Sequence, residues 1–282
     1  MSAPSTRQLM TAPAGAPGGD DRPRIRRGVQ LQAVVRFTVL EAWRSRLPWL
    51  LLATLACAFA ASQFAAELAI TEGGRFRAAL LAGGVRFAWV FIFAVYVIGS
   101  LTRELNERGF EVALAMELDR STWVVGKLAG FLLPAFAAAC CLFPLLAALS
   151  TPAAAAAWCL SFGFELAIVV AAALFFTLNL ASVPAAAVLT AGFYLLARAI
   201  DALVLIASSS PLLVAGAWRD FARLAVDALA WLLPGLGRFA QGGWLAGQGP
   251  DAALLALMGA QCAVYVVLLC AAALVDFHRR DL

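Results

Sequence analysis

The sequence predicts an all-α membrane protein that crosses the bilayer six times. The chain is 63% hydrophobic and only 13% charged over 282 residues, which excludes an ordinary soluble domain of this length. Its apolar residues gather in runs of about 20, the length that a membrane-spanning helix needs. Charges or prolines end these runs. The six expected spans cover residues 47–66, 85–102, 124–149, 153–180, 183–208 and 252–275.

The first 28 residues predict a disordered cytoplasmic tail. They are rich in Pro, Gly, Ala and Ser and contain no apolar run, so they cannot bury enough apolar surface to fold. A cleavable signal peptide is not expected, because an apolar stretch should follow the charges much sooner. The basic cluster RPRIRR either binds anionic lipid head groups or only fixes the topology.

Residues 29–46 predict an amphipathic helix in the inner membrane interface. Apolar side chains such as Phe37 and Trp43 stand among charged ones such as Glu41 and Arg46. Trp favours head-group depth, while the arginines face water. The alternative is that the first span simply begins early.

A dense charged segment at 101–127 follows the second span. Arg103, Glu104 and Arg108 indicate that this span continues as a helix into water. Glu104 and Arg108 are four residues apart and can form a supporting ion pair. Gly109 then permits a bend.

A short amphipathic helix is expected after this bend. Phe110, Leu114 and Leu118 recur at helical spacing, and Glu111 occupies the first turn, where the helix dipole favours an acid. Asp119 can cap the helix that becomes the third span. A rigid helix between two spans offers a surface that a cytoplasmic partner can push. The alternative is a solvated hairpin.

Three ionisable residues lie inside predicted spans, although a charge at the bilayer centre costs about 3 kcal/mol or more. Glu165 is expected about 10 Å below the outer surface, at 1.5 Å per helical residue. We predict that it faces Arg198 and Asp201 in a mutually neutralising cluster. This cluster is either an ion pair that joins two spans or a polar patch in a translocation path.

The segment 209–251 predicts an outer amphipathic helix before the last span. Apolar residues such as Phe221 and Leu224 lie opposite Arg223 and Asp227, and a Pro-Gly pair ends the pattern. Such a helix should lie in the outer interface or dip into it as a re-entrant element.

The orientation follows from the Lys and Arg residues beside the spans. With the N-terminus inside, the larger group is cytoplasmic: Arg7, Arg22, Arg24, Arg26, Arg27, Arg36, Arg44, Arg46, Arg103, Arg108, Arg120, Lys127, Arg279 and Arg280. The smaller group is external: Arg75, Arg77, Arg86, Arg219, Arg223 and Arg238. An even number of spans then returns the C-terminus to the cytoplasm.

The chain lacks the usual signatures of a catalytic or metal site. All six cysteines fall inside predicted spans without C-x-x-C spacing, and the sole histidine is His278. The Gly-Lys pair at 126–127 lacks the rest of a phosphate-binding loop. We therefore expect no metal, no cofactor in this chain, no nucleic-acid partner and no enzyme activity. An intramembrane enzyme would need a catalytic cluster that the sequence does not display.

One region carries a family resemblance. The segment SLTRELNERGFEVALAMELDRSTWVVGKLAG resembles the region after the second span in ABC-2 type transporter permeases. There a charged run, a Gly, a Leu-rich short helix, an Arg-containing turn and a Gly-Lys pair recur in that order. The interfacial helix, the six spans and the basic C-terminal tail extend the resemblance over nearly the whole chain after residue 28. Family members commonly have a proline in the turn, where this chain has LDRST.

The resemblance implies a permease subunit in the bacterial inner membrane that works with a second copy or a paralogue. A separate cytoplasmic ATPase would bind ATP and Mg²⁺ and drive export, with membrane lipids around the permease. The ATPase-coupling residues would be Arg103, Glu104, Arg108, Gly109, Phe110, Glu111, Leu114, Glu117, Leu118, Asp119 and Arg120. By the same resemblance, the outer helix before the last span would cap the exit as a gate or merely cover the spans.

The alternative function is an integral membrane scaffold or assembly factor that docks a partner without transport. The substrate of a permease of this kind ranges from lipids and drugs to polysaccharides and peptides. An apolar lining rich in Ala and Leu favours an amphiphilic cargo.

Overall fold

The computed structural model describes residues 27–68, 73–106, 120–180, 182–209, 217–240, 244–245 and 251–279. Within these ranges the chain is almost entirely helical and contains no strand. Six candidate membrane spans lie in the same ranges. Within the described residues, the predictions of an all-α fold and of six helices long and apolar enough to span a membrane are therefore confirmed. Most of the expected N-terminal tail lies outside the described residues.

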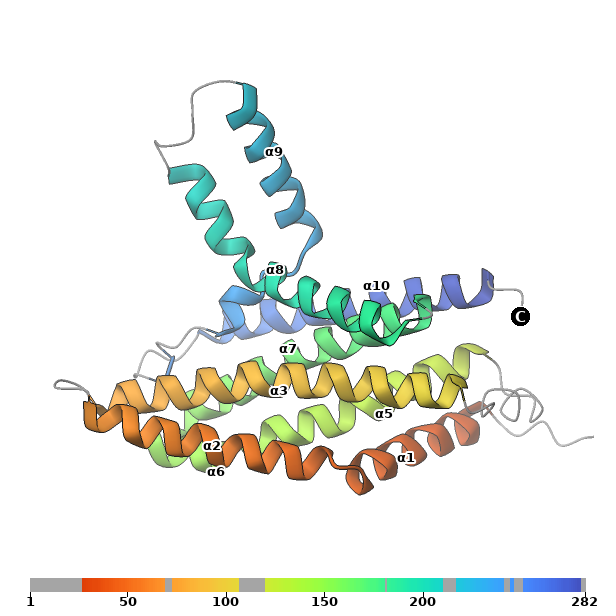
Figure 1. Ribbon diagram of the computed structural model, residues 1–282, viewed down its shortest axis with the longest axis horizontal. Coiled ribbons are helices and arrows are strands. Elements are labelled where there is room, and N and C mark those ends of the chain that lie inside the picture. The colour runs from red at the N-terminus through yellow and green to blue at the C-terminus, as the bar shows by residue number, and fades with distance from the viewer. Residues whose placement is uncertain are drawn as a thin grey trace, which may run out of the picture.

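The helices follow one another along a bundle (Figure 1). They are α1 (Arg27–Arg44), α2 (Leu47–Leu68), α3 (Gly73–Asn106), α5 (Arg120–Cys141), α6 (Phe143–Leu149), α7 (Pro152–Asn179), α8 (Val183–Ser209), α9 (Ala217–Leu232), the short 3₁₀ helix η1 (Leu236–Ala240) and α10 (Ala252–Arg279). The candidate spans are Leu47–Ala65, Arg77–Asn106, Ser121–Leu149, Pro152–Asn179, Val183–Ile206 and Ala252–Asp276.

Two spans differ from the sequence prediction. The second begins well before residue 85, because α3 is one continuous helix from Gly73. Arg86, which the topology prediction counts with the external arginines at the start of the span, therefore lies inside the bundle. The third span is interrupted at Leu142, between α5 and α6. Pro144 explains this break, because proline has no N–H to donate and its ring clashes with the preceding helical turn.

The helix α7 forms the centre of the bundle. In the most apolar 18-residue stretch of α7, 78% of the residues are buried, whereas the corresponding share is 11% in α2 and in α10. Thr151 caps its start, since its hydroxyl accepts a hydrogen bond from the Ala154 N–H, and Pro152 occupies the first turn. The peripheral helices α2 and α10 present leucines and valines outward, as lipid-facing helices do.

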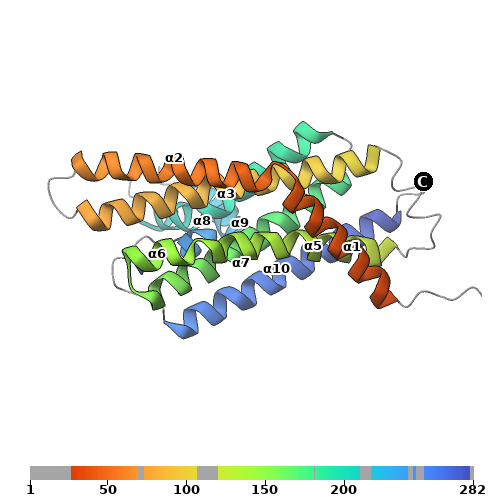
Figure 2. The same ribbon diagram turned by 90° about the horizontal axis from the view of Figure 1, so that it is seen from below.

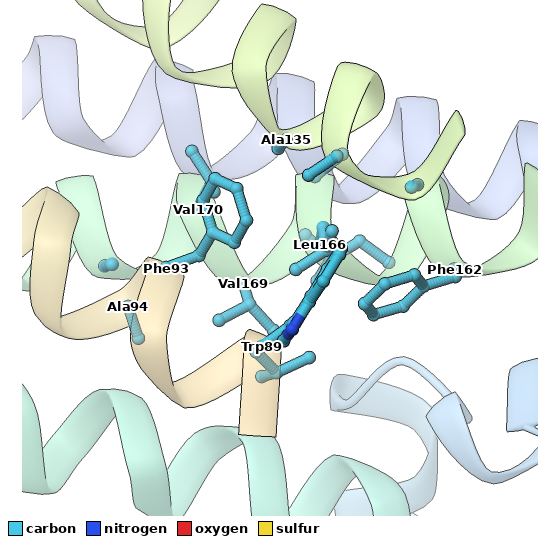
Figure 3. Packing of buried hydrophobic residues seen from close by; sticks show 14 of the residues in the cluster. Trp89, Phe93, Ala94, Ala135, Phe162, Leu166, Val169 and Val170 are labelled. Carbon is cyan, nitrogen blue, oxygen red and sulfur yellow. The ribbon is translucent and has the colours of Figure 1, made fainter. Parts of the chain in front are cut away.

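Aromatic and branched side chains join α3 to α7 (Figure 3). Trp89 and Phe93 of α3 point toward Phe162, Leu166 and neighbouring residues of α7. The rings of Trp89 and Phe162 have centroids 6.2 Å apart. This contact fixes α3 laterally against the central helix.

The helix α1 packs tightly against α5. A methyl group added at Gly126 would lie 2.8 Å from the Val34 side chain, and one at Gly130 would lie 2.6 Å from Thr38 Cβ. Two glycines four residues apart thus let the two helices approach closely, as small residues do in membrane proteins. The exposed positions of α1 carry both large apolar residues, such as Phe37 and Trp43, and charged ones, such as Arg36.

The end of α8 and the whole of α9 project sideways from the bundle as a helical hairpin (Figure 1). Figure 2, the view from below, shows the hairpin behind the bundle, which agrees with this arrangement. Large apolar residues on the hairpin are exposed, among them Leu205, Phe221, Leu224 and Trp231. The chain then returns to the bundle through η1.

The helix α1 and the last turns of α10 lie at the same end of the bundle in both views (Figures 1 and 2). We call this the α1 end. The end of α2, the start of α3 and the α6–α7 connection lie at the opposite end.

Candidate functional site

A buried charged cluster lies at the middle of the bundle. Glu165, near the midpoint of α7, is fully buried, as is Arg86 of α3. Glu165 Oε2 lies 2.5 Å from Arg86 Nε, and Glu165 Oε1 lies 2.9 Å from Arg198 Nη1 of α8. One carboxylate therefore binds two guanidinium groups from two other helices. We call Arg86, Glu165 and Arg198 the buried triad.

The aromatic and hydroxyl groups around Arg86 complete its environment. Its Nη2 donates to Ser161 Oγ at 2.8 Å. Its guanidinium carbon lies 4.8 Å from the ring centroid of Trp158 and 5.3 Å from that of Phe162. Cation–π contacts of this kind are strongest in desolvated sites. Its Nη1 has no hydrogen-bond partner among the described residues.

Arg198 differs from Arg86 because it reaches the protein surface. Its side chain is 27% exposed. Its Nη1 also donates to the hydroxyl of Tyr194 at 3.1 Å. The triad therefore has one entirely enclosed cation and one at its margin.

The 3₁₀ helix η1 packs beside the buried triad and contacts Ser161, which accepts a hydrogen bond from Arg86. Ser161 Oγ donates to the Phe239 carbonyl at 3.1 Å, and both Leu236 and Phe239 are completely buried. Irregular backbone at membrane depth is tolerated where protein groups satisfy and bury it. In the described part of the connection before the last span, η1 packs into the bundle, and the interfacial or re-entrant placement of the amphipathic helix stays a prediction.

The expected partnership of Asp201 is different in the structure. Among the described residues it pairs with Arg238 of η1, with Arg238 Nε 3.4 Å from Asp201 Oδ1, and both side chains are substantially exposed. Asp201 also crowds the backbone of η1, since a methyl group at Gly237 would lie 2.9 Å from its Oδ2. The structure thus brings Glu165 and Arg198 together and places Asp201 against η1. Arg86 takes the place that we expected for Asp201.

Glu165 lies deeper than expected. We placed it about 10 Å from the outer surface by counting from Trp158. Trp158 is not the start of the span, because α7 begins six residues before it, at Pro152; Glu165 is therefore at the middle of this helix by residue count. At that depth a single charge is costly, and the ion pairs with Arg86 and Arg198 offset this cost.

A second cluster joins three helices at the α1 end. Glu41 of α1 accepts hydrogen bonds from Arg103 Nη2 and, at 2.8 Å, from Ser100 Oγ, both on α3. Lys127 of α5 is 1% exposed and forms an ion pair with Glu104 of α3. Lys127 Nζ also lies 3.9 Å from Glu41 Oε2. We call Glu41, Ser100, Arg103, Glu104 and Lys127 the root cluster.

The root cluster contains only some of the predicted coupling residues. Arg103 and Glu104 belong to it, and Arg120 begins α5. Glu104 also accepts a hydrogen bond from Trp123 Nε1 at 3.2 Å. The remaining predicted coupling residues lie outside the described part of the chain: Arg108, Gly109, Phe110, Glu111, Leu114, Glu117, Leu118 and Asp119. The suggested Glu104–Arg108 pair and the short amphipathic helix therefore stay predictions.

Sequence reasoning missed Arg86, Glu41 and Lys127 as partners in these clusters. Arg86 is the second residue of the expected span 85–102, so the sequence counts it with the external arginines and gives it no buried partner. The spacing Gly126-x-x-x-Gly130 was a usable signal, because it marks a close helix contact that brings α1 beside Lys127. The described residues include no group of three His, Cys, Asp or Glu side chains that could hold a metal ion.

Comparison with known proteins finds no family model and no curated protein that matches this chain.

Proposed function

We propose that this chain is the membrane-spanning subunit of an ABC-2 type transporter in the bacterial inner membrane. It would export an amphiphilic substrate and take its energy from ATP hydrolysed, with Mg²⁺, by a separate cytoplasmic ATPase. The proposal rests first on the resemblance of residues 100–130 to such permeases. The six candidate spans and the amphipathic α1 are compatible with it.

The root cluster is the observation that best supports this proposal. The segment 107–119 joins the end of α3 to the start of α5, and the root cluster lies beside both of these ends. Ion pairs there hold α3, α5 and α1 to one another. A partner that pushes on the segment would therefore move three helices together. A solvated hairpin that binds no partner would not need ion pairs that fix three helices beside it.

The helix α3 connects the root cluster to the buried triad. Ser100, Arg103 and Glu104 lie near its last turns, and Arg86 lies in its first half. In the proposed mechanism, ATP-driven closure of the ATPase displaces the α1 end of α3. This displacement changes the contacts of Arg86 with α7 and α8. The partly exposed Arg198 then offers a positive group to an acidic part of the cargo.

A second permease copy would cover the projecting hairpin. The end of α8 and α9 carry exposed apolar side chains outside the bundle, as Figure 1 shows. In the proposed dimer this hairpin lies against the bundle of the second copy. The helix η1 follows the hairpin in the chain and is hydrogen-bonded to Ser161 through the Phe239 carbonyl. A movement of the hairpin would therefore reach Ser161 through η1.

The test is purification of the tagged full-length chain from its native membranes in mild detergent. We expect a P-loop ATPase to copurify, and we expect its hydrolysis rate to rise in the complex. The double variant Phe110→Ala/Leu114→Ala should weaken ATPase binding several hundredfold, because two anchors of about 2 kcal/mol each contribute about 4 kcal/mol together. As matched control, Val267→Ala/Leu268→Ala removes similar side chains from exposed positions on α10 and should not change recovery.

Undiminished ATPase recovery with the double variant would overturn the coupling role of 110–118. Absence of any copurifying ATPase would remove the transporter proposal itself. If the ATPase binds but amphiphiles do not stimulate it, and reconstituted vesicles move no cargo, then the chain is a scaffold.

A further inference from the structure

An open groove lies on the surface between the start of α2 and the middle of α3. Its volume is about 340 Å³. Apolar side chains form its walls, among them Leu50 of α2 and Phe91, Ile92 and Val95 of α3. Ser45 and Arg46, at the turn between α1 and α2, form its end nearest the α1 end of the bundle. The groove is thus apolar along its length and cationic at one end.

The position of the groove matches the boundary between head groups and acyl chains. The first candidate span begins at Leu47, one residue after Arg46. Trp43 and Trp49, beside this turn, are 79% and 76% exposed. Exposed tryptophans at the end of a span are typical of the membrane interface. Arg46 therefore lies at head-group depth and the groove extends from it into the acyl region.

The cation at the end of the groove is available to a ligand. Arg46 is exposed and forms no ion pair with another described residue. Arg103, by contrast, is engaged by Glu41. The hydroxyl of Ser45 is also committed, since it donates to the Ala42 carbonyl and accepts from the Leu47 N–H. Arg46 is thus the group that would meet an anion here.

The size of the groove suits one acyl chain. An apolar cavity of about 150 Å³ accommodates a benzene molecule, so that 340 Å³ corresponds to roughly a dozen carbon atoms. We propose that the groove binds one anionic glycerophospholipid, with an acyl chain against Leu50 and Val95 and its phosphate on Arg46. This inference needs only a membrane-spanning chain and does not depend on the transporter proposal.

The test is native mass spectrometry of the full-length chain in detergent, titrated separately with phosphatidylglycerol and with phosphatidylcholine of the same acyl chains. We expect one saturable phosphatidylglycerol site and weaker binding of phosphatidylcholine. Arg46→Gln should weaken phosphatidylglycerol binding about fivefold, the effect of one cation near an anionic head group. Its matched control is Arg44→Gln, an exposed arginine that does not line the groove.

The second variant, Val95→Trp, fills the groove from a 63% exposed position and should abolish saturable binding of both lipids. Val188→Trp, at a 69% exposed position on α8, should have no such effect. The proposal is overturned if Val95→Trp binds phosphatidylglycerol like the parent chain, or if Arg44→Gln and Arg46→Gln weaken it equally. A dimer that Val95→Trp dissociates, without saturable lipid binding in the parent, would show that a second copy occupies the groove instead.

Discussion

Glu165 illustrates how one residue can decide whether a membrane bundle holds together. It is the only acid in the buried triad, and two guanidinium groups depend on it. Arg86 is so enclosed that water cannot replace a lost carboxylate. Breaking a buried pair by removing one partner is much more costly than losing an exposed pair.

We predict that Glu165→Gln lowers the free energy of unfolding by at least about 3 kcal/mol, because it leaves Arg86 and Arg198 uncompensated. Arg238→Gln removes an exposed pair with Asp201 and should cost less than about 1 kcal/mol. Thermal unfolding of the two purified variants measures the difference. If Glu165→Gln unfolds like the parent chain but no longer transports cargo, the triad serves the translocation path rather than the fold.

The triad also marks how far single residues could be predicted. Glu165 and Arg198 stand out in the sequence because each is a charge inside a long apolar run. Arg86 does not stand out, because it is near the edge of a run and edges are read as loops. Asp201 is expected in the cluster only because it is close to Arg198 in the sequence. Its actual partner, Arg238, belongs to η1, and this short 3₁₀ helix has no periodic sequence pattern from which it could be predicted.

Among the helices, α1 and α5 make close contact because two positions of α5 are glycines, which have no side chain. Gly126 and Gly130 leave room for Val34 and Thr38, and Thr38 is fully buried against this surface. Glu41 lies less than one turn beyond Thr38 on the same helix. The close approach therefore also sets the distance from Glu41 to Lys127.

We predict that Gly130→Ala destabilises the protein by about 1–3 kcal/mol, since the added methyl group overlaps Thr38. Gly99→Ala is the matched control, because a methyl group at Gly99 meets nothing within 4 Å. Helix propensity favours Ala at both positions, so any loss at Gly130 alone comes from packing. Equal unfolding temperatures for the two variants would contradict the tight α1–α5 contact.

Apolar run length predicted which helices exist, and local chemistry decided where they end. The bounds of α2 and α7 follow closely from Pro48 and Pro152 at their first turns. The break before α6 was signalled by Pro144 but hidden within a continuous apolar run. The start of α3 could not be predicted from hydropathy, because Arg77 and Arg86 interrupt the run while the helix continues through both.

For the whole molecule, the two ends of the bundle differ in what they carry. The α1 end holds the root cluster, and the opposite end holds the short α6 and the start of α10 (Figure 2). If the α1 end faces the cytoplasm, as the distribution of Lys and Arg predicts, the proposed ATPase would approach the bundle from the end that carries the root cluster.

We predict that a cysteine at Asn106, in a chain without the native cysteines, is labelled by an impermeant maleimide only after the cells are permeabilised. A cysteine at Asp251, also exposed but at the opposite end, should be labelled in intact cells. A cysteine at the exposed position Val267 on α10 is the control and should stay unlabelled in both cases, because it faces lipid. The reverse pattern for Asn106 and Asp251 would contradict the predicted orientation and the proposed coupling role of the root cluster.

The unbroken course of α3 has a consequence for the kind of motion that the molecule permits. A continuous helix of 34 residues, about 50 Å long, cannot shorten between its two charged contacts. Sliding along its axis would therefore disengage Glu104 from Lys127 and Arg86 from Glu165 in the same event. A close-packed interior is not continuously deformable, so α3 should not rest at positions between the engaged and the disengaged state. Fluorophores on α3 and α7 should then report two discrete separations with rapid jumps between them, and not a continuous spread.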